Sequence, residues 1–185
     1  MDKPVILIET DRLLIRKISS GDDTGMFELD SDPEVHRFLG NKPFKTIDQS
    51  RDQIQFIKKQ YIENGIGRWA IEDRVTNEFV GWTGFKLMRE TINHHSNYYD
   101  FGYRLKRKFW GKGYATESAN AAMGYGIDTL QFTDIYGMTD VNNIASRRVL
   151  EKIGMTYIET FNYNGEPDWR AMGEPTVWYK KIFPQ

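Results

Sequence analysis

Apolar residues along this chain fall into short runs, and their spacing alternates between the two-residue period of strands and the 3.6-residue period of helices. Seven runs have strand character and end at charged, glycine or asparagine residues. They cover residues 12–17, 67–72, 78–87, 98–105, 134–139, 155–161 and 176–182. We therefore expect a sheet of about seven strands.

Helix signals fill the intervals between these runs. The expected helices cover residues 22–29 with a further turn over 33–38, then 46–64, a segment starting at 113, and 142–153. Gly65 and Gly154 stand where a left-handed residue would close the long helix and the last helix. The mixed order of elements predicts an α/β (α+β) fold, and we expect residues 1–185 to form a single domain.

The stretch from Tyr103 to Glu117 concentrates the candidate chemistry. It joins a strand to a helix through four basic side chains and two glycines, Gly111 and Gly113. Glycine lets a backbone approach a ligand closely, and the first turn of a helix offers unpaired N–H groups and partial positive charge. A strand, a basic glycine loop and a helix start together predict an anion site, most often for phosphate.

Two common nucleotide motifs do not fit this stretch. A Walker-type loop needs Ser or Thr after its lysine, but Lys112 is followed by Gly113. A dinucleotide fingerprint needs a third glycine three residues after Gly113, and the chain has Thr116 there. The phosphate-binding prediction therefore stands without either motif.

The run Lys108-Phe-Trp-Gly-Lys-Gly113, followed by Tyr-Ala-Thr-Glu117, resembles the acetyl-CoA pyrophosphate loop of the GNAT N-acetyltransferases. The nearest branch is that of the ribosomal-protein N-terminal acetyltransferases (RimJ/RimL-like), although Lys108 stands where Arg or Gln is usual. The resemblance implies a GNAT fold, with a mixed, mostly antiparallel sheet and helices on both faces, and acetyl-CoA as co-substrate. The implied cofactor contacts are Tyr103, Leu105, Lys108, Gly111, Lys112, Gly113, Tyr114, Ala115, Thr116, Asn143 and Ser146.

A second segment supports the same family resemblance. Asn143-Ile-Ala-Ser146, followed by Val149 to Met155, resembles the other cofactor segment of the family. Asn143 could hydrogen-bond the amide-rich pantetheine arm, and the resemblance implies that Ser146 protonates the departing CoA thiolate. Asn and Ser are also favoured as ordinary helix caps, so that reading stays open. Residues 10–16 and 158–181 resemble the same branch less specifically.

Acetyl transfer to an amine needs a neutral amine, a stabilised oxyanion and a thiolate that can leave. Gly102 predicts a bulge that splays its strand from a neighbour and frees backbone N–H groups to polarise the carbonyl. Asp100 is the candidate base, acting directly or through water, and an ordinary solvated carboxylate is the alternative. A lysine amine, with a reference pKa of about 10.4, needs such a base more than an α-amine near 8.

Composition narrows the function without naming it. The net charge of −1 gives no reason to expect nucleic acid or a membrane surface as a partner, and no run approaches the ~20 apolar residues of a membrane span. Absence of cysteine excludes disulfides and thiol catalysis, and three histidines are too few to argue for a metal. We expect a cytoplasmic, metal-free protein, either monomer or homodimer, with Trp69, Trp82 and Trp178 in its core.

The sequence thus predicts an acetyl-CoA-dependent N-acetyltransferase that works by direct attack, with a protein or peptide N-terminal α-amine as the expected acceptor. One alternative is a small-molecule amine such as a polyamine, an aminoglycoside or an amino acid. Another is a non-catalytic acyl-CoA-binding module. Three acids of the late loop would favour a cationic amine if they border the cleft, although we prefer ordinary solvation as their explanation: Glu166, Asp168 and Glu174.

Overall fold

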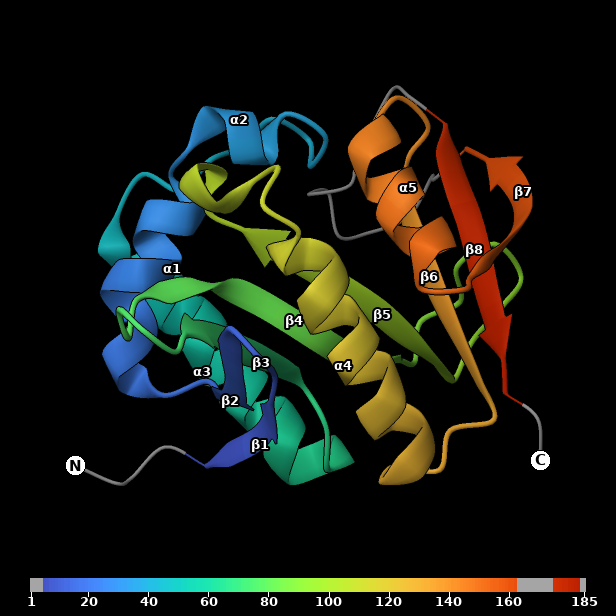
Figure 1. The fold of residues 1–185 in the computed structure, drawn as a ribbon. Coiled ribbons are helices and arrows are strands. Elements are labelled where there is room, and N and C mark those ends of the chain that lie inside the picture. Colours follow the sequence, from blue (N-terminus) through green and yellow to red (C-terminus); the bar gives the residue numbers. More distant parts are fainter. Residues whose placement is uncertain (1–4, 163–174, 184–185) are drawn as a thin grey trace.

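The computed structural model describes residues 5–162 and 175–183 (Figure 1). Its strands are β1 (Ile6–Glu9), β2 (Leu13–Lys17), β3 (Arg68–Asp73), β4 (Phe79–Met88), β5 (Tyr98–Leu105), β6 (Asp134–Asp140), β7 (Thr156–Phe161) and β8 (Thr176–Ile182). Its α-helices are α1 (Asp23–Asp30), α2 (Pro33–His36), α3 (Ile47–Asn64), α4 (Tyr114–Asp128) and α5 (Ile144–Lys152). The acids Glu166, Asp168 and Glu174 lie outside the described residues.

One sheet of eight strands runs through the molecule in the order β1-β2-β3-β4-β5-β6-β8-β7. Every neighbouring pair is antiparallel except β5 and β6, which are parallel. The sheet has one strand more than the expected seven, because the short apolar run Ile6–Glu9 pairs with β2 as an edge strand. The predicted helices are confirmed, including left-handed Gly65 and Gly154 at two helix ends.

Helices cover both faces of the sheet, as Figure 1 shows. On one face, Ala119 and Ala122 of α4 and Leu150 of α5 are buried in the largest core cluster. The small residues of α4 let it lie close to the sheet: a Cβ on Gly126 would come within 2.9 Å of the Phe85 ring. On the other face, α1 and α3 form a second core cluster against β3 and β4. The interior therefore has two apolar layers, separated by the sheet.

β5 and β6 part from each other beyond Phe101. Their parallel ladder contains only the pairs Asp100–Tyr136 and Phe101–Gly137. The expected splay near Gly102 is therefore present, but the expected bulge is absent, because β5 pairs with β4 in unbroken register from Tyr98 to Leu105. Beyond Phe101 the edge of β5 that faces β6 has no ladder partner, which leaves a gap at the carboxyl ends of both strands.

No helix within residues 5–162 and 175–183 is long and apolar enough to cross a bilayer.

Candidate active site

A cavity of about 820 Å³ opens where β5 and β6 diverge. One wall is the end of β5, the glycine loop and the start of α4, and the wall across from it is α5. The end of β6 and the segment from α2 to Asn41 complete the lining. Nine of the residues predicted from the sequence for the cofactor line this cavity: Tyr103, Leu105, Gly111, Gly113, Tyr114, Ala115, Thr116, Asn143 and Ser146. The candidate base Asp100 also lines it.

The glycine loop has the backbone conformation that an anion cradle needs. Gly111 has φ 73° and Gly113 has φ 83°, both in the left-handed region that residues with a Cβ rarely adopt. Gly113 is also the residue that caps the amino end of α4, a helix of 15 residues. The unpaired N–H groups of this first turn therefore meet the cavity at a point of partial positive charge.

The four basic side chains before the loop do not supply free positive charge to the cavity, which corrects that part of the sequence-based prediction. Each forms an ion pair with an acid of another element: Arg104 with Asp30, Lys106 with Glu28 and Glu78, Arg107 with Asp32, and Lys108 with Glu78. The side chains of Lys108 and Lys112 lie outside the cavity lining. Anion binding at this loop therefore depends on its backbone N–H groups.

Asn143 caps α5, since its side-chain oxygen accepts a hydrogen bond from the Ser146 N–H at 3.2 Å. One turn into the helix, the Ser146 hydroxyl faces the Tyr103 phenol across the gap between α5 and β5. Burial raises the pKa of the Tyr103 phenol, and the nearby Ser146 hydroxyl offsets part of that rise. The two hydroxyl groups meet at the point where β5 has left β6, and both line the cavity.

Asp100 is held in a buried ion pair, which the sequence did not reveal. Its Oδ2 accepts a hydrogen bond from Arg68 Nη2 at 2.5 Å, and its main-chain oxygen accepts one from Arg68 Nη1 at 2.8 Å. The Asp100 side chain is 3% exposed and the Arg68 side chain 11%. Asp100 is therefore part of the floor of the cavity and not a solvated carboxylate.

Trp82 was expected in the core with Trp69 and Trp178, and that expectation is wrong for Trp82 alone. Trp69 and Trp178 are buried, whereas Trp82 is half-buried and lines the cavity. The guanidinium groups of Arg68 and Arg104 lie 5.3 and 5.2 Å from its ring centroid. An indole ring beside two paired cations gives this part of the cavity a flat, polarised surface.

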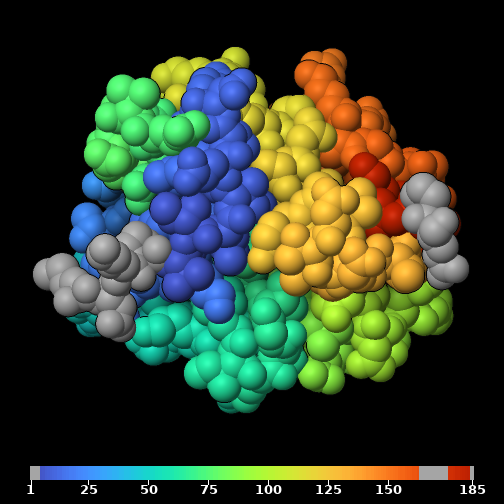
Figure 2. Space-filling model, turned by 60° about the horizontal axis from the view of Figure 1, so that its bottom comes forward, coloured from blue at the N-terminus to red at the C-terminus, as the bar shows by residue number. Residues whose placement is uncertain are grey.

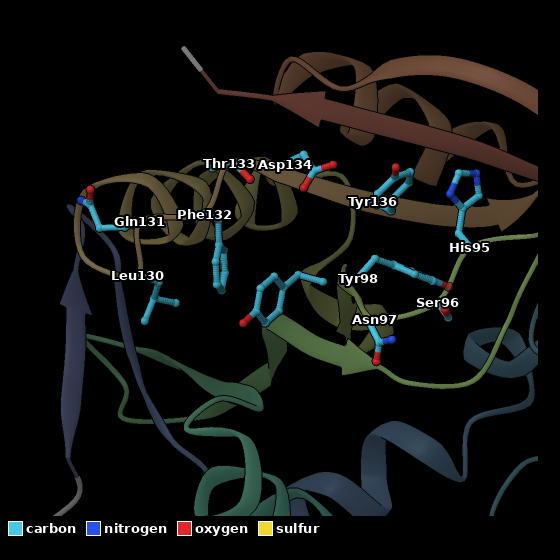
Figure 3. Close-up of a pocket in the computed structure, with 11 residues that line it drawn as sticks. His95, Ser96, Asn97, Tyr98, Leu130, Gln131, Phe132, Thr133, Asp134 and Tyr136 are labelled. Atoms are coloured by element: carbon cyan, nitrogen blue, oxygen red, sulfur yellow. The ribbon is translucent and has the colours of Figure 1, made fainter. Parts of the chain in front are cut away.

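A second cavity of about 450 Å³ lies at the amino ends of β5 and β6, the opposite end from the glycine loop (Figure 3). Tyr99 and Phe132 stack within it with ring centroids 3.9 Å apart. Its one acidic side chain, Asp134, binds Lys180 at 2.8 Å. None of the residues predicted for cofactor or catalysis lines this cavity, so the larger cavity is the candidate active site.

The larger cavity fits acetyl-CoA on three observations of this structure. Its volume lies within the ~300–1,000 Å³ of small-molecule and cofactor sites. Two left-handed glycines place bare backbone at one end, where a pyrophosphate would be bound. The gap between β5 and β6 leaves strand backbone open beside it, where an amide-rich arm could pair.

Comparison with known proteins identifies the family. Residues 12–156 match the family model described as an acetyltransferase (GNAT) domain. The chain is 33% identical over 162 residues to YkkB of Bacillus subtilis, covering 85% of this chain and 90% of that protein. It is 29% identical to the FsC-acetyl coenzyme A-N(2)-transacetylase of Aspergillus fumigatus, covering 85% and 75%.

Solved structures show the same fold. A GNAT-family acetyltransferase from Bacillus anthracis superposes with a TM-score of 0.76 at 26% identity, covering 95% of this chain and 97% of that one. At 14% identity, ribosomal-protein-S5-alanine acetyltransferase from Vibrio fischeri gives 0.75, covering 98% and 97%. At 17% identity, spermidine N-acetyltransferase from Vibrio cholerae gives 0.70, covering 94% and 96%. The chain therefore belongs to the GNAT acetyltransferases and is an acetyl-CoA-dependent N-acetyltransferase.

Proposed function

We propose that this enzyme acetylates the N-terminal α-amine of a peptide or protein, as the RimJ/RimL-like branch does, by direct attack of the amine on the acetyl thioester. The observation that carries the proposal is the facing pair of hydroxyl groups of Tyr103 and Ser146, placed where β5 has separated from β6 inside the cavity. A proton donor at that point lies within the cavity that would hold the acetyl thioester. It is in position for the step in which the thiolate leaves.

In this proposal, Ser146 donates the proton that the departing thiolate needs, and Tyr103 holds the serine hydroxyl in place. Asn143 orients the pantetheine arm from the start of α5, in addition to capping the helix. The backbone beyond Phe101 polarises the thioester carbonyl, because that edge of β5 has no ladder partner on β6. Each role falls to a residue that lines the cavity or to backbone bordering the gap.

The ion pair of Asp100 favours an α-amine over a lysine side chain or a polyamine. Direct proton abstraction by Asp100 would require its short contact with Arg68 to open. An α-amine, with a reference pKa near 8, is partly neutral at physiological pH without a base, whereas an alkylamine near 10.4 is almost wholly protonated. Asp100 would then accept a proton only through a water molecule, while Arg68 keeps the Asp100 carboxylate in place.

A cationic small-molecule amine is the second candidate. Glu34 of α2 and Asp140 at the end of β6 line the cavity, and within residues 5–162 and 175–183 neither forms an ion pair. Two carboxylates without cation partners would suit an ammonium group. Both acceptor classes occur among similar proteins: one solved relative is named for a ribosomal protein and another for spermidine.

A matched pair of peptides separates the two candidates. One peptide carries a free N-terminus and no lysine, and the other has the same sequence with an acetylated N-terminus and one lysine. Release of free CoA with acetyl-CoA as donor is followed for both, with spermidine in a third reaction. Turnover of the first peptide alone supports the proposal, whereas turnover of spermidine alone supports the second candidate.

A further inference from the structure

The glycine loop is anchored from outside by the N-terminal segment of the chain, about 100 residues away. Figure 2 shows the blue N-terminal strands lying along the yellow start of α4. Arg12, just before β2, donates from Nη1 to the Lys112 carbonyl oxygen at 2.9 Å. Lys112 is the residue between the two left-handed glycines, Gly111 and Gly113. One side chain therefore holds the central peptide group of the loop.

The direction of that contact decides where the next N–H points. A trans peptide places its C=O and its N–H on opposite sides, so the Lys112 carbonyl and the Gly113 N–H point in opposite directions. Arg12 holds the carbonyl toward the N-terminal segment. The Gly113 N–H is thereby turned the other way. Because glycine has no side chain, it is the backbone of Gly113 that lines the cavity.

Arg12 is itself fixed by Glu117 of α4. Its Nε lies 2.7 Å from Glu117 Oε2 and its Nη2 lies 2.5 Å from the same oxygen, while its main-chain N–H donates to Oε1 at 3.2 Å. Thr10 donates to Glu117 Oε1 at 2.6 Å. With Nη1 on Lys112, each nitrogen of the guanidinium has a protein partner. Arg12 is therefore arranged to orient the loop and not to reach a phosphate directly.

We propose that Arg12, held by Glu117, is a positioning residue that presets the Gly113 N–H for the pyrophosphate of acetyl-CoA. The inference rests on the placement of acetyl-CoA in this cavity and adds a residue from outside the cavity lining. Two left-handed glycines make the loop unusually free to rotate its central peptide. An external hydrogen bond to that peptide lowers the ordering cost of binding, because the donor group already points at the ligand.

Plain electrostatic attraction between Arg12 and the pyrophosphate is the competing explanation. The variant Glu117→Gln distinguishes the two explanations, because they predict opposite changes in acetyl-CoA affinity. The substitution removes a negative charge beside the loop. If only charge matters, acetyl-CoA should bind more tightly to Glu117→Gln than to the wild type. If positioning matters, binding should weaken, because Arg12 loses the carboxylate that holds it.

The test measures acetyl-CoA affinity by calorimetry and steady-state kinetics for Arg12→Ala, Arg12→Lys and Glu117→Gln. The matched control is Arg74→Ala: Arg74 is similarly exposed and binds the Thr10 carbonyl at 2.5 Å and Glu9 at 3.8 Å on the same segment. We expect Arg12→Ala to raise the Kd and KM for acetyl-CoA roughly tenfold at unchanged kcat, because the loop must then order its central peptide when the ligand binds. Arg12→Lys should recover part of the loss, and Arg74→Ala should match the wild type.

A truncated donor shows whether the effect acts through the pyrophosphate. S-acetyl-pantetheine carries the same thioester without a pyrophosphate, so wild type and Arg12→Ala should use it equally well. Equal acetyl-CoA affinity for wild type and Arg12→Ala, or tighter binding by Glu117→Gln, would overturn the inference while leaving the proposed function intact. Failure of the wild type to bind acetyl-CoA would instead overturn the placement of the cofactor in this cavity.

Discussion

Arg68 reaches from β3 across β4 to bind Asp100 on β5, with Nη2 and Oδ2 2.5 Å apart. Arg68, Gly84 and Gly102 lie side by side in register across the three strands. A Cβ on Gly102 would come within 3.0 Å of Arg68 Nη2, so a side chain there would displace the guanidinium. Gly102 thus makes room for a buried cation at the floor of the cavity.

Breaking this pair from one side should be costly. Arg68→Met leaves Asp100 as a buried carboxylate without its cation, and we expect a loss of roughly 3–5 kcal/mol in the free energy of unfolding. Arg68→Met combined with Asp100→Leu removes both charges and should recover most of that loss. Denaturant unfolding of both variants checks this. A single Arg68→Met variant as stable as the wild type would show that the pair does not anchor the strands.

The facing hydroxyl groups of Tyr103 and Ser146 predict a shared effect on turnover. Ser146→Ala removes the proposed proton donor and should lower kcat by on the order of 100-fold while leaving the Kd for acetyl-CoA nearly unchanged. Tyr103→Phe should lower kcat less, because the serine hydroxyl remains but loses the partner that orients it.

The double variant is the control for that interpretation. If the two hydroxyls act as one unit, Ser146→Ala with Tyr103→Phe should be no slower than Ser146→Ala alone. Losses that multiply would mean that the two residues act independently. Unchanged turnover in Ser146→Ala would remove Ser146 from the mechanism.

Much of this site could be predicted from the sequence, because its residues are close together in the chain. Gly111 and Gly113 sit in one loop, and Asn143 and Ser146 in one helical turn, so local spacing places them. The Arg68–Asp100 pair could not be predicted, because it forms through strand register and the space that Gly102 leaves for the guanidinium. Local spacing also suggested a bulge at Gly102, where the structure has continuous pairing.

The ion pairs of the four basic residues before the glycine loop also could not be predicted from local spacing. Composition counts four cations before the loop, but only the folded chain brings acids of α1, the α2 cap and the β3–β4 hairpin onto them. Strand β1 was not predicted from the sequence, for a different reason. Ile6–Glu9 is too short to show a period of two, and it becomes a strand only by pairing with β2.

Asp73 ties the β3–β4 hairpin to the start of α4 and predicts a pH dependence of stability. Its Oδ1 accepts from the Thr76 N–H at 2.9 Å, and its Oδ2 accepts from the Tyr114 hydroxyl at 2.7 Å. The hydrogen bond from the Thr76 N–H, followed by that from Tyr114, lowers the pKa of Asp73 to about 2. A lowered pKa contributes stability above the unfolded value near 4, and this contribution is lost as the pH falls toward 2.

Comparison with Asp73→Asn isolates that contribution. The wild type should lose roughly 2 kcal/mol more stability between pH 6 and pH 2.5 than Asp73→Asn does, since the variant has no carboxylate to protonate there. Denaturant unfolding at both pH values gives the difference. Parallel losses in the two proteins would contradict the role assigned to Asp73.

Gly113, which caps α4, and Gly124, which lies inside α4, should respond in opposite directions to substitution by alanine. Gly113→Ala places a Cβ at φ 83° and should cost about 1–2 kcal/mol of stability and weaken acetyl-CoA binding. Gly124→Ala lies inside α4 with nothing within 4 Å of the new Cβ, and should stabilise the protein by up to about 1 kcal/mol. Thermal unfolding and acetyl-CoA calorimetry on both variants test this. Equal behaviour would contradict the strained-loop account.

The pH dependence of peptide acetylation tests the central claim most directly. The substrate is a lysine-free peptide with a free N-terminus, and kcat/KM is measured as CoA release from pH 6 to pH 10. If the enzyme takes an α-amine without a strong base, kcat/KM should rise with an apparent pKa near 8 and then level off, in the wild type and in Asp100→Asn alike. No turnover of this peptide at any pH, with rapid turnover of a lysine side chain or a polyamine, would contradict the account.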